Sequence, residues 1–292
     1  MAGDVASGVA VGVLTHPVPD DLADRFSNIY RLDVSVPDGG RITDILQPEW
    51  ANLRFFSEKS ATAELEGPEP SIESCFVSSG PLAKPIRFSM GTTRMWGVAL
   101  LPLGWAMHVG TQASELADTM VDGESHEAFR HFIPLGEAIR AQCGDAKREF
   151  AAMLDWLRAD AREVRDADRI RRVQEVMGDP YLVQVGEFAE AAGLNPRTLE
   201  RLCRRHFGFS PAVLLRRQRL IRTVTAFMAA GEGSWTEVID RHYHDHSHFV
   251  REFHNFMGMS PTAYAKMDHP ILSAFVDRRR DIWGDPVKRE GR

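Results

Sequence analysis

The most informative segment of the chain reads Gly193-Leu194-Asn195-Pro196-Arg197-Thr198-Leu199-Glu200-Arg201-Leu202-Cys203. Asparagine is a favoured N-cap and proline a favoured first helical residue, so Asn195 and Pro196 predict the start of a helix. Gly193 suits the turn before it, because glycine adopts positive φ without steric cost. Three later residues share one apolar face at the spacing i, i+3 and i+4: Leu199, Leu202 and Cys203. We therefore expect a turn and then a capped amphipathic helix from Pro196 to His206.

The remaining surface of this predicted helix is charged. Its candidate DNA-facing residues are Arg197, Glu200, Arg201 and Arg204. Arginine can donate two hydrogen bonds to a guanine edge or to a phosphate, as recognition helices do in the major groove. A shorter helix ending at Ala192 precedes the turn, and Gly208 closes the second helix. The segment is therefore predicted to be a helix-turn-helix unit, here called unit one.

A later segment repeats these features. Gly258-Met259-Ser260-Pro261 matches Gly208-Phe209-Ser210-Pro211, and each follows a predicted recognition helix. Asp245 is the expected N-cap of the second such helix, which runs from His246 to Met257. Its candidate DNA-facing residues are His246, Ser247, His248 and Arg251. An internal repeat of this kind predicts two DNA-reading units, and the second is here called unit two.

A long helix is predicted between the two units, from Pro211 to Ala230. Its arginines suit either phosphate contact or an ordinary solvated surface, and they are Arg216, Arg217, Arg219 and Arg222. At ~1.5 Å per residue this helix is ~30 Å long, close to the ~34 Å between successive major grooves on one face of DNA. The spacing therefore permits both recognition helices to contact one duplex.

These residues resemble a known family. From about Arg171 to Lys266 the chain is similar to the DNA-binding domain of AraC/XylS-type transcriptional regulators, and the matching segments are 194–201, 208–211, 245–253 and 258–264. Two front segments, 97–104 and 115–118, resemble the N-terminal domain of one branch of that family. The resemblance implies a sequence-specific regulator that binds double-stranded DNA. It also implies a β-rich front domain that senses an unknown small molecule or forms a homodimer, with activation or repression left open.

Unit two departs from the family pattern at its turn. Its first helix is expected over Trp235 to Arg241, with a capping-box pattern of Ser234 and Glu237 at its start. The family has a glycine before the aromatic residue of the turn, but this chain has His242 before Tyr243. His242 either adopts positive φ at a cost of ~1 kcal/mol or more, or sits in a remodelled turn with ordinary φ. We favour the remodelled turn, because the first helix is also one residue short.

The front half of the chain predicts a different architecture. Short apolar runs separated by glycine and proline indicate strands over 26–34, 52–56, 61–65, 74–77, 86–90 and 95–101. Helical spacing follows over 114–121, 135–142 and 146–161, and then a charged connector over 158–172. The predicted fold class is α+β, with a β-rich sandwich or barrel in front and an all-α domain of two helix-turn-helix units behind. The expected domains are 1–160, 161–270 and a polar tail over 271–292.

Composition supports a protein that meets phosphate with one half only. The net charge is −6, but the chain from Arg171 onward has 19 Lys and Arg against 15 Asp and Glu. The first 170 residues therefore carry the acidic surplus, a weak indication that agrees with DNA binding by the back half. The three cysteines lack disulfide or metal spacing, and neither a signal peptide nor an apolar run of membrane-spanning length is present. We expect a cytoplasmic, non-enzymatic protein without cofactor.

Two alternatives remain at this point. Five histidines between His242 and His254 could indicate a metal-binding sensor, but Asp245 should leave His244 outside the helix and no cysteine is near. A small-molecule-binding enzyme with a helical interaction domain is the second alternative. Ser78-Ser79-Gly80 is not a nucleophile elbow, and Cys75 lies in a predicted strand without an activating motif.

Overall fold

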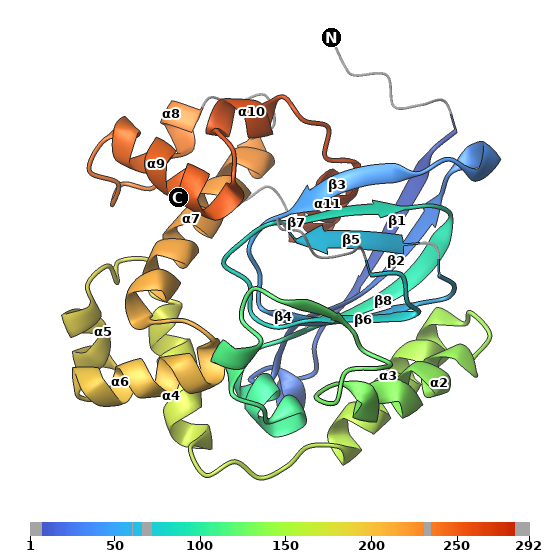
Figure 1. The fold of residues 1–292 in the computed structure, drawn as a ribbon, viewed down its shortest axis with the longest axis horizontal. Helices are drawn as coiled ribbons and strands as arrows, with labels where there is room; N and C mark the ends of the chain where they lie inside the picture. The colour runs from blue at the N-terminus through green and yellow to red at the C-terminus, as the bar shows by residue number, and fades with distance from the viewer. Residues whose placement is uncertain (1–7, 60, 66–71, 231–234, 284–292) are drawn as a thin grey trace.

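The computed structural model describes residues 8–59, 61–65, 72–230 and 235–283. The strands and helices from Ala10 to Ala159, here called the front domain, lie beside the helices from Ala167 to Ala265, here called the back domain (Figure 1). This arrangement confirms the predicted α+β fold class, with strands in front and helix-turn-helix units behind. None of the helices in this part of the chain is long and apolar enough to cross a membrane.

The front domain contains two antiparallel sheets. The six-stranded sheet has the order β1 (Ala10–His16), β2 (Phe26–Ser35), β8 (Thr93–Leu100), β4 (Ala51–Phe56), β6 (Phe76–Ser79) and β9 (Met120–Asp122). The three-stranded sheet has the order β3 (Ile42–Leu46), β7 (Ile86–Met90) and β5 (Ala61–Leu65). The β4–β8 register pairs Leu53 with Val98 and Phe55 with Trp96, which aligns large apolar side chains on one face.

Successive side chains of a strand point to opposite faces, and this alternation builds two cores. On β4, Leu53 and Phe55 pack with helices α2 (Ile133–Arg140) and α3 (Ala146–Ala159), which cover one face of the six-stranded sheet. Arg54 and Phe56 face the other way, toward the three-stranded sheet. The region between the two sheets therefore holds a charged residue within an apolar core.

Several parts of the front domain differ from the sequence prediction. Strand β1 lies before the first predicted strand at 26–34 and pairs with β2 from Ala10–Ser35 to His16–Ile29. The helix expected over 114–121 is replaced by a 3-10 turn, Ala113–Glu115, and strand β9, because pairing with β6 overrides local helical spacing. Strand β3 has no counterpart in the prediction. After β8 the chain forms the short helix α1 (Pro102–Gly104), followed by the π-helical turn η3 (Trp105–Val109).

The back domain follows the predicted order of helices. Unit one comprises α5 (Val185–Ala191) and α6 (Pro196–Leu202), and α6 continues as the π-helical turn η6 (Cys203–Phe207). Helices α7 (Pro211–Ala230) and α9 (His246–Met257) have the predicted bounds, whereas α8 (Trp235–Val238) ends earlier than expected. Helices α4 (Ala167–Met177) and α10 (Pro261–Ala265) precede and follow the two units. The predicted helix end at 231–233 and the cap at Ser234 lie outside the described residues.

The segment predicted as a polar tail from 271 begins as a helix. Helix α11 (Pro270–Trp283) runs back along the front domain, where its Ile271 and Phe275 join the core between the two sheets. Figure 1 shows α11 behind the strands of the front domain, well away from α5 and α6. The sequence suggests a tail because polar residues predominate near the end of the chain. The four apolar residues Ile271, Leu272, Phe275 and Val276 precede them.

Candidate nucleic-acid interface

Unit one has the predicted geometry at its turn and at the start of α6. Gly193 has φ of 67°, the left-handed conformation expected there. The Asn195 side chain accepts a hydrogen bond from the Thr198 backbone N–H at 2.8 Å, as an N-cap should. Arg197, Arg201 and Arg204 are exposed, and Arg204 pairs with Glu200 at 2.7 Å. Arg197 and Arg201 therefore make no ion pair with a described residue, whereas the Glu200 carboxylate is paired with Arg204.

The C-terminal end of α6 is buried against the front domain. Gly208 has φ of 85°, and a Cβ placed on it would lie 3.0 Å from Pro81 of the front domain. Cys203 and His206 are buried in η6. Burial raises the pKa of the Cys203 thiol to about 12 and lowers that of His206 to about 4, so both groups are neutral at pH 7. The outer, N-terminal part of α6 is the part left accessible to DNA.

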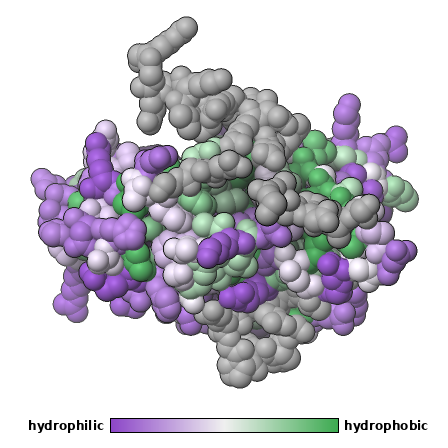
Figure 2. Space-filling model, turned by 90° about the horizontal axis from the view of Figure 1, so that it is seen from above, coloured by the Kyte–Doolittle hydropathy of each residue, from purple (hydrophilic) through white to green (hydrophobic). Residues whose placement is uncertain are grey.

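Unit two presents a similar capped helix. The Asp245 side chain accepts a hydrogen bond from the His248 backbone N–H at 2.7 Å. His246, Ser247 and Arg251 are exposed on the first turns of α9. His248 is half-buried, and its Nε2 lies 3.7 Å from Glu252 Oε2. The structure thus brings three of the four predicted residues to the surface together, while His248 leans toward its own helix. The view from above shows mostly hydrophilic residues at the end occupied by unit two (Figure 2).

The turn of unit two is remodelled. Among described residues other than glycine, positive φ occurs only at Asp38, Asp118 and Cys143, so His242 has an ordinary φ. Asp240 holds the turn by accepting hydrogen bonds from the His242 backbone N–H at 2.9 Å and from its ring at 2.8 Å. Burial opposes ionisation of Asp240, but these bonds and Arg222 outweigh it and lower its pKa. A side-chain turn has replaced the glycine turn of the family pattern.

Because His242 has ordinary φ, His242→Gly is expected to destabilise the protein. The substitution removes the ring contact with Asp240 and adds backbone freedom to the unfolded chain, which costs ~0.5–1 kcal/mol. Chemical denaturation monitored by circular dichroism would measure the change as a lower midpoint. A higher midpoint would contradict the remodelled turn, since glycine stabilises only where positive φ is strained.

Three arginines of α7 form ion pairs with unit two. Arg216 and Arg219 each lie 2.9 Å from the carboxylate of Glu252, which is buried on α9. Arg222 makes an ion pair of 2.9 Å with Asp240. Sequence reasoning missed Glu252, although it follows Phe249 by three residues on the apolar face of α9 and so has a buried position. These pairs fix the orientation of α9 relative to α7.

Arg217 of α7 is fully buried beneath the front domain. Its Nη1 donates to the backbone carbonyls of Leu82 at 3.0 Å and of Glu49 at 3.3 Å. Its guanidinium carbon lies 4.0 Å from the ring centre of Trp50, a cation–π contact. Nε and Nη2 have no hydrogen-bond partner among the described residues. Burial lowers the pKa of Arg217 to about 10, which leaves it charged at pH 7.

A second contact joins the front domain to the chain after unit two. Asp44 of β3 is buried, and its Oδ2 accepts hydrogen bonds from the Ile271 and Leu272 backbone N–H groups at 2.9 Å each. Its Oδ1 lies 3.0 Å from Nδ1 of His269, whose Nε2 lies 3.1 Å from the Tyr264 carbonyl. Asp44 therefore caps α11 from another domain and connects the front domain to α10.

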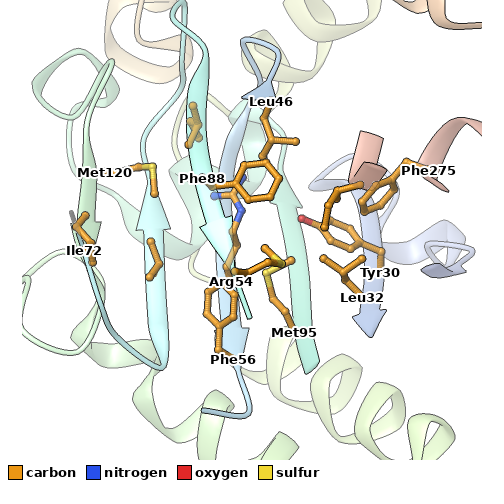
Figure 3. Close-up of a pocket in the computed structure, with 14 residues that line it drawn as sticks. Tyr30, Leu32, Leu46, Arg54, Phe56, Ile72, Phe88, Met95, Met120 and Phe275 are labelled. Atoms are coloured by element: carbon orange, nitrogen blue, oxygen red, sulfur yellow. The ribbon is translucent and has the colours of Figure 1, made fainter. Parts of the chain in front are cut away.

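A narrow cavity of about 40 Å³ lies between the two sheets and α11. Its walls are apolar apart from a few polar atoms, and Figure 3 shows Arg54, Tyr30 and Phe88 converging in it, with Phe275 of α11 at one side. Burial disfavours the charge on Arg54, but its ion pair with Glu49 outweighs burial and raises the pKa of Arg54. Burial raises the pKa of Tyr30 to about 12, so its hydroxyl is neutral.

The metal-binding and enzyme alternatives raised by the sequence gain no support from this geometry. Within the part of the chain that the structure describes, no three His, Cys, Asp or Glu side chains are grouped as a metal ion would require. His244 and His248 are linked instead by a hydrogen bond of 3.4 Å from the His244 backbone N–H to the His248 ring. Cys75 is half-buried beside β6.

Comparison with known proteins agrees with the helix-turn-helix geometry. Residues 188–267 match a family model described as a helix-turn-helix domain. No curated protein sequence matches the chain. Solved structures with a related arrangement include ToxT from Vibrio cholerae O395, at 12% identity over 88% of this chain and 96% of that one with a TM-score of 0.43. The AraC-like activator CuxR is similar at 12% identity over 73% of this chain and 85% of that one, with a TM-score of 0.30.

ToxT has also been solved with (E)-4-(8-methylnaphthalen-1-yl)but-3-enoic acid bound, and that structure covers 89% of this chain and 98% of its own at 12% identity, with a TM-score of 0.43. The family match and the two capped helices give residues 188–267 the architecture of a DNA-binding helix-turn-helix domain. Within that class, its helix-turn-helix domain at residues 188–267 is of the AraC type.

Proposed function

We propose that this regulator reads a specific DNA sequence by placing α6 and α9 in two successive major grooves on one face of the duplex. The observation that carries the proposal is the duplicated design of the two units. Each has a capped helix with exposed polar residues on its first turns, and one 20-residue helix, α7, separates them. At ~1.5 Å per residue α7 spans ~30 Å, which suits grooves ~34 Å apart.

Different residues are proposed to contact DNA in each groove and to cap each recognition helix. Arg197 and Arg201 are exposed on α6 without an ion pair to a described residue, so they are the proposed base or phosphate contacts in the first groove, assisted by Glu200 and Arg204. The proposed contacts in the second groove are His246, Ser247, His248 and Arg251. Asn195 and Asp245 act as helix caps that fix the start of each recognition helix.

The proposed effector is a small molecule bound in the cavity of the front domain. The cavity is walled by both sheets and by α11, so a molecule inside it would touch elements of the front domain and the chain that follows unit two. Regulation of DNA binding, rather than catalysis, is the proposed outcome of effector binding. The homodimer and the cytoplasmic location expected from the sequence stay predictions.

Selection of bound fragments from a random pool of duplexes tests this function. The full chain should enrich a motif with two parts spaced by about one helical turn, and it should bind the enriched duplex much more tightly than a scrambled one. Recovery without an enriched motif, or equal affinity for both duplexes, would overturn sequence-specific recognition.

Arg201→Ala is expected to weaken binding to the selected duplex by ~1–3 kcal/mol and to relax the preference at one or two base pairs. The matched control is Arg169→Ala, which removes an exposed arginine of α4 that pairs with Asp166 at 3.2 Å. Affinities of both variants for the selected and scrambled duplexes would be measured at fixed salt concentration. An equal loss on both duplexes for Arg201→Ala would reassign this residue to phosphate contact.

A further inference from the structure

Arg54 is the one cation among the described residues that line the cavity. It is 5% exposed on β4, and the neighbouring walls include the apolar side chains of Phe56, Phe88 and Met95. Its charged partner is Glu49, which forms an ion pair through Nη2, while Nη1 lies 3.5 Å from Ser79 Oγ. A guanidinium in apolar surroundings binds carboxylates strongly and in a planar, two-pronged manner. The cavity thus has the chemistry to hold an apolar molecule that carries one anionic group.

Glu49 connects this cation to the back domain. Its side chain holds Arg54, and its backbone carbonyl accepts a hydrogen bond from Arg217 of α7 at 3.3 Å. The next residue, Trp50, stacks on the Arg217 guanidinium at 4.0 Å and packs edge-on against Phe207 of η6 with ring centres 6.1 Å apart. Two consecutive residues therefore touch the cavity cation, the helix that spaces the two units, and the end of the first recognition helix.

The contact at Arg217 is poised to change. Arg217 is fully buried, yet Nε and Nη2 have no hydrogen-bond partner within the described part of the chain. A buried cation with unmet donors is costly, so the docked arrangement holds only while the contacts of Glu49, Trp50 and Leu82 compensate. Such an arrangement can be shifted by a ligand that favours one state over the other.

We propose that the effector is an apolar molecule with a carboxylate or similar anionic group, and that it acts by replacing Glu49 as the partner of Arg54. Released from Arg54, the 49–50 segment shifts, and the support of Arg217 and Phe207 shifts with it. The positions of α6 and α7 relative to the front domain change as a result, and DNA affinity changes with them. The coupling from Arg54 through Glu49 and Trp50 to α7 is here called the relay. This inference rests on the proposed function, because the relay is measured through its effect on DNA binding.

The size of the cavity adds a requirement. At about 40 Å³ it is far smaller than the ~300–1,000 Å³ of typical ligand sites, so an occupant must displace a wall. Ile271 and Phe275 belong to α11, which lies outside both sheets, and Phe275 contacts the ring of Tyr30 at 4.8 Å. Entry of the effector therefore also moves the chain that follows unit two.

The test uses octanoate and its uncharged counterpart octan-1-ol with the full chain. Calorimetry should show octanoate binding about tenfold more tightly than octanol, as a charge-assisted bond to Arg54 implies. Arg54→Met and Arg54→Lys should reduce this preference, and the lysine variant keeps the charge in case the methionine variant folds poorly. Glu49→Gln should strengthen octanoate binding, because the competing carboxylate is gone, whereas Glu58→Gln, at an exposed position just after β4, should not.

DNA affinity supplies the second readout. Octanoate should change the affinity for the selected duplex by about fivefold or more, and Glu49→Gln without octanoate should change it in the same direction. Equal binding of octanoate and octanol, no binding of either, or a Glu49→Gln variant that matches the wild type in both assays would overturn the relay. Failure of the proposed function is a separate result, since it would show as absent sequence preference in the wild type without any probe.

Discussion

Asp44→Ala is expected to cause a large loss of stability and to release α11 from the front domain. The substitution removes a buried carboxylate that accepts hydrogen bonds from the Ile271 and Leu272 backbone N–H groups and contacts His269. Without Asp44 Oδ1, the buried Nδ1 of His269 would lose the partner that now lies 3.0 Å away. Leaving a buried polar group without its partner typically costs ~1–3 kcal/mol, and the Ile271 N–H, the Leu272 N–H and the His269 ring each lose their contact with Asp44. The free energy of unfolding from urea denaturation measures the loss.

Two further variants separate the charge from the cap. The Asp44→Asn variant keeps a side-chain carbonyl that can accept from the α11 backbone, so a smaller loss of ~1–2 kcal/mol is expected. Asn195→Ala removes a cap at an exposed helix start and should cost ~1 kcal/mol. If Asp44→Ala costs no more than Asn195→Ala, the contact between β3 and α11 contributes little, and the helix is a loosely attached tail as its sequence suggests.

The elements that the sequence predicted well are those set by neighbouring residues. Helices α7 and α9 begin and end where predicted because proline, Asp245, Gly258 and similar residues act on the backbone within one turn. The caps at Asn195 and Asp245 were found for the same reason. Strands β3 and β9 were missed because each is defined by pairing with a strand far along the chain. Strand β1 was missed although it pairs with β2, the next strand in the sequence.

The candidate nucleic-acid interface shows the same difference between features set by neighbouring residues and features set by distant ones. Exposed residues on the first turns of α6 and α9 could be predicted, since an N-cap and an apolar stripe fix which side faces outward. The roles of the α7 arginines could not, because their partners are Glu252 and Asp240 of unit two and carbonyls of the front domain. Asp44 and His269 are 225 residues apart in the sequence, so no local pattern connects them. From the sequence alone, these arginines could be interpreted as available for contact with DNA phosphates.

A second large effect is expected in the pH dependence of stability, because the packing of unit one on the front domain buries His206. His206 lies in η6, is 7% exposed, and has an Nε2 without a hydrogen-bond partner among the described residues. Burial, helped by the positive charge of Arg205, lowers the pKa of His206 from 6.5 to about 4. The folded protein therefore resists protonation of this ring at pH values where the unfolded chain is already protonated.

The sign of the effect follows from this order of pKa values. Between pH 6.5 and about 4 the unfolded chain binds a proton that the folded chain does not, so stability falls as the pH falls. The contribution of His206 is complete above pH 6.5 and is lost as the pH approaches 4, amounting to about 3 kcal/mol over this range at ~1.4 kcal/mol per pKa unit. Burial also lowers the pKa of His16, His108 and His131, so their contributions have the same sign.

His206→Leu should therefore flatten the dependence of stability on pH between 6.5 and 4 without abolishing it. Free energies of unfolding from urea denaturation at several pH values would give the slope for each variant. Leu202→Ala is the control, because it removes apolar packing from the same helix but no titrating group, and it should lower stability at every pH while keeping the wild-type slope. If His206→Leu and Leu202→Ala show the same slope as the wild type, His206 is accessible to protons in the folded state. The close packing of η6 against the front domain would then be wrong, and with it the route by which the front domain is proposed to act on the first recognition helix.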